Sequence, residues 1–131
     1  MKALSIEATI VLNQMTGMME DFCARIDNSK GQFMPVYVAL FNKYLGNRII
    51  SVGHYKSIDG EIIANPEMRF MFDEEDNQYY PIYYRQDCLD VIQESVKTVG
   101  GEVRQVRKTL QEEHAKFADI WLRNIKYQQN L

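Results

Sequence analysis

Three consecutive strand patterns joined by short polar turns, between residues 49 and 84, constrain this chain more than any other feature. Apolar and aromatic residues alternate with polar ones along residues 48–57, 67–73 and 78–86, as expected for strands with one buried face. Residues 74–77, Glu-Glu-Asp-Asn, predict an acidic turn between the last two strands. Strands joined by turns this short form an antiparallel meander.

The flanking segments predict further strands. Residues 33–44 predict a first strand, which Pro35 places at an edge of the sheet because proline cannot donate to a β-ladder. Residues 45–47 predict a hairpin turn, and residues 58–66 a longer connection. A fifth strand is expected within residues 90–98.

The chain predicts a helix at each end. Residues 5–26 begin with Ser5 as a possible N-cap and carry an apolar stripe at helical spacing. The stripe consists of Ile6, Ile10, Asn13 or Gln14, Met18, Phe22 and Ile26. Residues 104–128 carry a second stripe, Val106, Leu110, Phe117, Trp121 and Ile125, with Trp121 as the expected main anchor. The fold class is therefore α+β, an antiparallel four- to five-stranded meander sheet flanked by an N-terminal and a long C-terminal helix.

Matching the apolar sets of neighbouring strands predicts the register and the two faces of the sheet. The even-numbered residues form the core face under the C-terminal helix, in the rows Leu40, Val52, Phe70, Ile82 and Val38, His54, Met68, Tyr84. The odd-numbered residues form an aromatic face, in the rows Tyr37, Tyr55, Glu67, Arg85 and Ala39, Gly53, Arg69, Tyr83. Glu67 and Arg85 thus become a candidate charge pair. Either the first helix or a partner covers this aromatic face, and we expect the helix.

Length and composition limit the possible classes of protein. A chain of 131 residues suits one domain, residues 1–131, and a net charge of −3 argues against a general nucleic-acid binder. The start resembles no secretory signal, and no apolar run reaches the roughly 20 residues of a membrane span, so we expect a cytoplasmic protein without membrane contact. Cys23 and Cys88 form no Cys-x-x-Cys pair, so we predict reduced thiols, no metal site and no cofactor.

No catalytic fingerprint occurs in the sequence. His54 titrates near neutral pH and lies beside Tyr84 in the predicted core row, so His54, Glu67 and Tyr84, with Gln86 nearby, form an alternative enzyme or ligand-binding pocket. Glu67 points to the opposite face, which counts against this alternative. We favour a structural His54 that bonds to Tyr84 or to a backbone carbonyl.

Charge is distributed unevenly along the chain. Residues 59–76 hold seven acidic residues and one basic residue, and residues 97–126 hold seven basic and four acidic residues. The acidic segment is a candidate docking edge for a basic partner, and the final helix, with Arg104, Arg107 and Lys108, is a candidate contact for nucleic-acid phosphates. Solvated turns and a solvated helix face are the favoured interpretation of both.

Several short motifs occur together along the predicted strands and the final helix. They are Phe33-Met34-Pro35, Ile50-Ser51-Val52-Gly53-His54-Tyr55, Asn65-Pro66-Glu67-Met68, Tyr80-Pro81, Tyr84-Arg85-Gln86-Asp87, Phe117-Ala118 and Trp121. Through them, residues 33–127 resemble an uncharacterised domain family of bacterial plasmids, conjugative elements and phages, except around residues 99–105. The resemblance implies a mobile-element accessory protein in a bacterial cytoplasm, and it carries over no catalytic residue.

The expected function is a non-enzymatic interaction module that binds a protein partner. The candidate binding residues are Tyr37, Tyr55, Glu67, Tyr83 and Arg85. Homodimerisation through an edge strand or through the aromatic face is left open.

Overall fold

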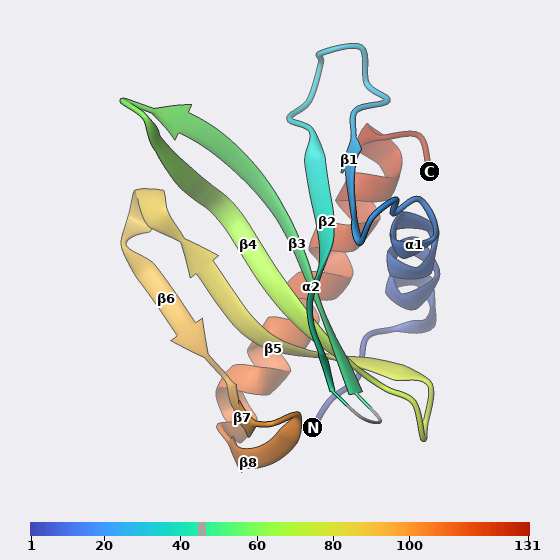
Figure 1. Cartoon of the computed structure of the whole chain (residues 1–131), viewed down its shortest axis with the longest axis vertical. Coiled ribbons are helices and arrows are strands. Elements are labelled where there is room, and N and C mark those ends of the chain that lie inside the picture. The colour runs from blue at the N-terminus through green and yellow to red at the C-terminus, as the bar shows by residue number, and fades with distance from the viewer. Residues whose placement is uncertain (45–46) are drawn as a thin grey trace.

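The computed structural model describes residues 1–44 and 47–131, with only the backbone at residues 43 and 44. Its main sheet has six antiparallel strands in chain order (Figure 1): β1 (Cys23–Ile26), β2 (Val36–Tyr44), β3 (Asn47–Ile58), β4 (Glu61–Asp73), β5 (Gln78–Gln86) and β6 (Val91–Glu94). Helix α1 (Ile6–Gly17) precedes the sheet, and a 3-10 turn, η1 (Asp87–Leu89), joins β5 to β6. A separate hairpin, β7 (Val96–Val99) and β8 (Glu102–Val106), leads into α2 (Lys108–Gln128).

The α+β class and the antiparallel meander are confirmed, but the main sheet has six strands instead of four or five. The predicted first helix supplies the additional edge strand. α1 begins after Ser5, whose hydroxyl oxygen accepts the Ala8 N–H at 3.1 Å as an N-cap, and it ends at Gly17. Asp21 and Phe22 then have φ of 52° and 69°, as in a two-residue hairpin turn, and the chain returns as β1.

The prediction also differs from the structure before α2. The single strand expected within residues 90–98 is two strands, because the chain changes sheet at Ser95, whose N–H donates to the Ile82 carbonyl. α2 begins only at Lys108, so Arg104 and Val106 belong to β8 and not to the helix.

β3 and β4 are longer than predicted. The connection expected at residues 58–66 is a two-residue turn at Asp59 and Gly60, and β4 continues through Pro66, which a register shift between Gly53 and Tyr55 on β3 accommodates. β2 lies between β1 and β3, so the edge position predicted from Pro35 is wrong. Of the hairpin turn predicted at residues 45–47, residues 45 and 46 lie outside the described part of the chain.

Both helices pack side by side on one face of the sheet, the inner face (Figure 1). β2, β3 and β4 contribute even-numbered residues to this core, as predicted: Val36, Val38, Ile50, Val52, Met68 and Phe70. β5 differs, because odd-numbered Tyr79 is in this core while Tyr80 packs on the outer face. The helices contribute Ala8, Val11, Leu12 and Met15 from α1, and Ala118, Trp121, Leu122 and Ile125 from α2. The prediction that the first helix covers the odd-numbered, outer face is therefore wrong.

α1 buries the side opposite to the predicted one. Ile6 and Ile10 are 83% and 55% exposed, and Met18 and Phe22 are exposed as well. Because both sides of this helix are apolar, helical spacing alone does not show which side is buried.

Irregularities in the ladder change the predicted register. Across β4 and β5, Met68 pairs with Tyr84 as predicted, but a β-bulge then pairs Phe70 with Pro81 and turns Ile82 to the outer face. The register of β3 against both neighbours differs from the prediction by two residues. Val52 was expected opposite Leu40 and Phe70, but it lies opposite Val38 on β2 and Met68 on β4.

A second, smaller core covers part of the outer face. Ile49, Met71 and Ile82 pack there against Val96 of β7. β7 therefore covers this end of the outer face. Near β1 and the β3–β4 turn, no element of the described chain lies over the outer face.

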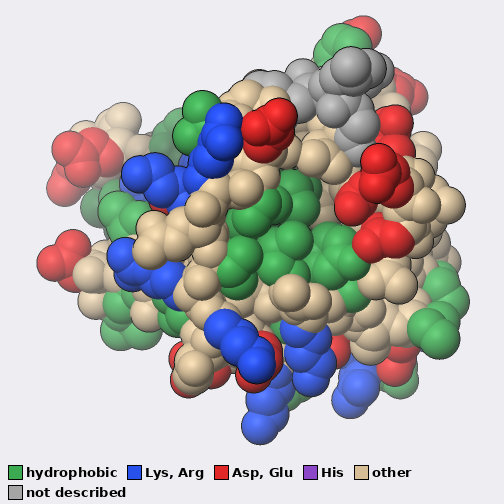
Figure 2. Space-filling model, turned by 90° about the horizontal axis from the view of Figure 1, so that it is seen from below, with side chains coloured by type: hydrophobic (Ala, Val, Ile, Leu, Met, Phe, Trp, Pro, Cys, Tyr) green, Lys and Arg blue, Asp and Glu red, His purple; other side chains and the backbone are tan. Residues whose placement is uncertain are grey.

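The end of the molecule around the N-terminus and the β7–β8 hairpin exposes a further apolar area. Figure 2 shows hydrophobic side chains gathered there, with acidic side chains on one border and basic side chains on others. A hollow of about 580 Å³ lies at this end and is lined by Met1, Lys2, Val106, Lys108, Gln111 and Glu112. The mixed charge of its border favours no class of partner.

α2 is held by apolar and by polar contacts. Trp121 is 8% exposed, as expected of an anchor, but Phe117 is 39% exposed, so it does not belong to a buried stripe. Two buried glutamines at the ends of the helical region bond to distant backbone groups. The Gln111 side chain accepts the Lys2 N–H at 2.7 Å, and the Gln129 side chain accepts the Asn28 N–H at 2.7 Å.

We expect Trp121→Ala to lower the free energy of unfolding by about 3–5 kcal/mol, because it removes a buried indole from the contact between α2 and the inner face. Phe117→Ala, on the same helix but partly exposed, is the matched control and should cost clearly less. Urea unfolding followed by circular dichroism measures both. Equal losses for the two variants would contradict the assignment of Trp121 to the core.

Candidate binding surface on the outer face of the sheet

Glu67 is the centre of a polar network on the outer face. Its side chain points outward from β4 and is nevertheless only 9% exposed. One carboxylate oxygen accepts the Tyr55 hydroxyl at 2.7 Å, and the other accepts the Arg69 Nε–H at 3.0 Å. Burial, followed by the hydrogen bond to Glu67, raises the pKa of Tyr55, so the phenol remains a protonated donor.

Arg69 lies between two aromatic rings from neighbouring strands. Its guanidinium carbon is 3.9 Å from the ring centroid of Phe41 on β2 and 3.9 Å from that of Tyr83 on β5. Arg69 and Tyr83 are direct partners in the ladder, which places the ring over the guanidinium. Two cation–π contacts and the bond to Glu67 together hold this long side chain in one position.

Tyr37 and Tyr55 extend the network towards the edge of the sheet. Their rings meet edge to face with centroids 5.7 Å apart, and the Arg25 Nε–H of β1 donates to the Tyr37 hydroxyl at 3.1 Å. The Tyr55 ring lies over Gly53, where a Cβ would come within 2.7 Å of it, so any side chain at this position would displace the Tyr55 ring. We call the connected set Arg25, Tyr37, Phe41, Tyr55, Glu67, Arg69 and Tyr83 the outer-face network.

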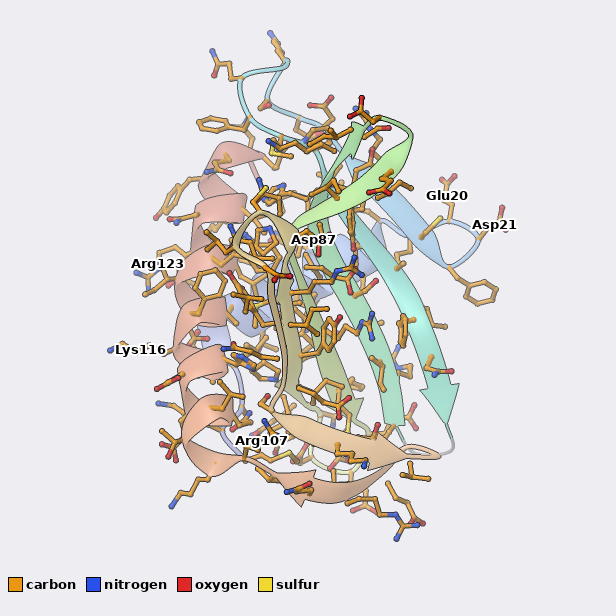
Figure 3. The ribbon with its side chains drawn as sticks, turned by 90° about the vertical axis from the view of Figure 1, so that its left-hand side faces the viewer. Glu20, Asp21, Asp87, Arg107, Lys116 and Arg123 are labelled. Atoms are coloured by element: carbon orange, nitrogen blue, oxygen red, sulfur yellow. The ribbon has the colours of Figure 1, made fainter. Side chains whose placement is uncertain are left out.

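Arg85 does not form the predicted pair with Glu67, although the two residues are partners in the ladder. Its guanidinium instead binds Asp87 through two bonds of 2.7 and 3.1 Å. Arg85, together with the Ala64 N–H, lowers the pKa of Asp87. Figure 3 shows Asp87 at the end of β5. Its bond from the Ala64 N–H, at 2.8 Å, ties η1 to β4.

Two hollows flank the outer-face network. The larger, of about 450 Å³, is lined by Tyr37, Tyr55, Lys56, Ser57 and Ile62, and we call it the edge groove. The smaller, of about 180 Å³, lies where β7 meets the sheet and includes Phe41, Arg69 and Tyr83. Tyr37 is 38% and Phe41 49% exposed, so the aromatic groups remain accessible between these hollows.

The residues of the alternative pocket are not brought together with Glu67. His54 lies on the inner side, with its ring 5.8 Å from that of Trp121 and its Nδ1 3.0 Å from the Pro35 carbonyl, the structural role that we favoured. Tyr84 is also on the side of α2, where its ring meets Phe117 and its hydroxyl donates to Gln86. Glu67 lies on the opposite face, so these residues form no common acid–base site.

His114 is a second histidine with a structural role. Its Nε2–H is placed to donate to Gln93 at 2.9 Å, while its Nδ1 is placed to accept the Ser95 hydroxyl at 2.8 Å. This arrangement uses both nitrogens of a neutral imidazole.

The structure divides each of the two charged segments between different elements. β4 separates the acidic residues, since Asp59 and Glu61 lie at one end of the strand, and Asp73 and the three acidic residues after it lie at the other end. Among the basic candidates, Arg104 is in β8 and pairs with Glu102 at 3.2 Å. Figure 3 shows Lys116 and Arg123 pointing away from the sheet along α2, with Arg107 at its start.

Within residues 1–44 and 47–131, neither helix has both the length and the apolar character needed to cross a bilayer. Over the same residues, no group of three or more histidine, cysteine or carboxylate side chains is arranged to hold a metal ion.

A family model described as "Domain of unknown function (DUF6908)" matches residues 7–131. The chain belongs to this family. The match includes α1 and the segment around residues 99–105, which the resemblance seen in the sequence did not cover. No curated protein and no solved structure compared with the chain matches it.

The sequence identified most, but not all, of the outer-face network. Tyr37, Tyr55, Glu67 and Tyr83 were predicted as candidates and lie together. The pairing of Arg69 with Tyr83 was predicted correctly, but Arg69 was not selected as a candidate, although an arginine between aromatic rows is a signal for cation–π stacking. Arg25 was missed because residues 23–26 were assigned to a helix.

We expect Glu67→Ala to lower the free energy of unfolding by about 1–3 kcal/mol, because it leaves the Tyr55 hydroxyl and the Arg69 guanidinium without their acceptor. Glu61→Ala, which removes an exposed carboxylate from the same strand, is the control and should have little effect. Urea unfolding of both variants tests this, and a similar midpoint for the two would mean that the network contributes nothing to stability.

Stability should also depend on pH through the two histidines. Burial lowers the pKa values of His54 and His114 below the ordinary 6.5, so the unfolded chain binds more protons than the folded protein between the lowered values and 6.5. The free energy of unfolding should therefore be highest above pH 6.5 and fall as the pH drops through this range. Urea midpoints measured from about pH 8 to about pH 5 test this, and the double variant His54→Gln/His114→Gln should flatten the dependence.

Proposed function

We propose that this chain is a non-enzymatic interaction module that binds a protein partner through the outer-face network. The observation that carries the proposal is that both helices cover the inner face, while the aromatic end of the outer face has no covering layer in the described chain. An aromatic surface of this kind on a sheet favours a docking site over a solvated face.

The composition and rigidity of the network support the proposal. Tyrosine and arginine are the side chains that most often dominate protein interfaces. Here Tyr55, Arg69 and Tyr83 are already fixed by hydrogen bonds and ring contacts, so binding would cost little side-chain entropy.

The charge around the network favours a protein over a nucleic acid. Arg25, Arg69 and Arg85 are each paired with a carboxylate, from Asp27, Glu67 and Asp87 respectively. These three arginines therefore offer no surplus positive charge for a phosphate backbone. The separation of His54 and Tyr84 from Glu67 likewise disfavours the enzyme alternative.

The proposed setting rests on the resemblance of the sequence motifs. We place the protein as an accessory protein of a bacterial plasmid, conjugative element or phage, acting in the cytoplasm. Membership of a family of unknown function is compatible with this setting and adds no activity to it.

The test is a quantitative pull-down from nuclease-treated bacterial lysate with tagged wild-type and variant proteins. Tyr37→Ala/Phe41→Ala removes the two exposed rings of the network and should reduce recovery of a specific partner on the order of tenfold or more. Phe117→Ala/Ile120→Ala, which removes similarly exposed side chains from α2, is the matched control and should leave recovery unchanged.

A partner that is retained by Tyr37→Ala/Phe41→Ala, or lost only with the α2 control, would overturn the proposal. Recovery that disappears with nuclease treatment would move the nucleic-acid alternative to first place.

A further inference from the structure

We propose that the partner contributes an extended segment, which pairs as an additional strand with the free edge of β3 at residues 55–57 and places an apolar side chain in the edge groove. This inference rests on the proposed function and specifies the form of the partner. Peptides commonly bind in this way to an open sheet edge, with main-chain hydrogen bonds for affinity and a pocket for specificity.

The edge of β3 is open because its neighbour leaves the sheet early. The pairing of β2 with β3 ends at Tyr37 and Gly53, whereas β3 continues to Ile58. Pro35, which precedes β2, has no N–H to continue the ladder. Its carbonyl lies against His54, and the Met34 carbonyl accepts a bond from Gln129, so the chain turns towards α2. Figure 1 shows the β3–β4 hairpin projecting beyond β2.

The turn at the end of this hairpin determines which backbone groups are free. Asp59 and Gly60 have φ of 51° and 82°, so Ile58 and Glu61 are the hydrogen-bonded pair that closes a two-residue turn. Hydrogen-bonding direction alternates along a strand, so Lys56 also faces β4 while Tyr55 and Ser57 direct their N–H and carbonyl groups to the open side. A docked strand finds two donors and two acceptors there.

The edge groove lies beside these groups. Tyr37 and Tyr55 form its aromatic wall, and Ile62, 73% exposed and opposite Ser57 in the ladder, forms its apolar side. A volume of about 450 Å³ accommodates one large aliphatic or aromatic side chain with room for its neighbours.

Charge specifies one further property of the segment. Asp59 and Glu61 are both exposed at the tip of the hairpin, and residues 57–63 contain no basic side chain. A lysine or arginine next to the apolar anchor of the partner would meet this acidic tip. The inferred ligand is therefore an extended apolar segment with a basic residue at one end.

A second copy of this chain fits the edge less well. Two copies could pair antiparallel through their β3 edges, with Tyr55 of each copy bonded to Ser57 of the other. This pairing places the Lys56 side chains of the two copies directly opposite each other. Like charges in directly opposed positions destabilise a strand pair.

The experiment begins with a random peptide library displayed on phage, selected on the intact protein and counter-selected on Tyr37→Ala/Phe41→Ala. Selected peptides are then synthesised and titrated by fluorescence anisotropy. Ser57→Pro removes the N–H that faces the open side and should weaken binding by about tenfold or more, whereas the matched Ser57→Ala keeps this N–H and should change the affinity less than about twofold. Circular dichroism and a urea midpoint verify that both variants are folded.

A scan of the peptide with N-methyl amides tests the pairing without altering the protein. Since only alternate amides of an added strand face β3, methylation should abolish binding at every second position of the paired segment and be tolerated between them. This pattern is expected even if Ser57→Pro does not fold.

The outcomes separate the two proposals. Peptides that depend on Tyr37 and Phe41 but tolerate Ser57→Pro and show no alternation would leave the proposed function standing and overturn strand pairing. No enrichment over the counter-selection would overturn both. A wild-type dimer that becomes monomeric with Ser57→Pro would assign the edge to a second copy and overturn the peptide proposal.

Discussion

Burial of the inner face of the sheet under both helices is the constraint on which the rest of the molecule depends. Val38, Val52, Met68 and Phe70 can leave water only if α1 and α2 share this one face. A six-stranded sheet has two faces, and among the described residues the hairpin formed by β7 and β8 is what remains to cover part of the other. The apolar and charged side chains of the uncovered part of the outer face therefore contact one another through hydrogen bonds and cation–π contacts.

The outer-face network is the result of that requirement. Glu67 is almost fully buried without a covering layer, because Tyr55 and Arg69 occupy the space around its carboxylate. Stacking of Arg69 between Phe41 and Tyr83 removes apolar ring surface from water while leaving the edges of the rings accessible. The same contacts that stabilise the fold thus present a rigid aromatic surface, which is why a structural and a binding role do not exclude each other here.

The predictions from the sequence were correct where the order of apolar and polar residues was compatible with one structure alone. The alternation in residues 78–86 gave β5 with its observed bounds, and the partners of Met68 and Glu67 on that strand were correct. They were wrong where the order of apolar and polar residues was compatible with more than one structure. α1 is apolar on both sides, so tertiary packing decided which side was buried, and the bulge that turns Ile82 outward leaves no signal in an alternation of apolar residues. Pro35 was predicted to mark an edge strand because it cannot donate to a ladder, but the open edge belongs to β3 and not to the strand that follows Pro35.

The two buried glutamines of the C-terminal region have a consequence for synthesis of the chain. The side chain of Gln111 bonds to the backbone of Lys2, and that of Gln129 to the backbone of Asn28. These two backbone N–H groups are synthesised early, but their acceptors are synthesised about 100 residues later. α2 also supplies part of the cover of the inner face. A nascent chain on the ribosome therefore carries a sheet whose inner apolar face is only partly covered until α2 emerges, and during that interval a chaperone that binds apolar surfaces can act.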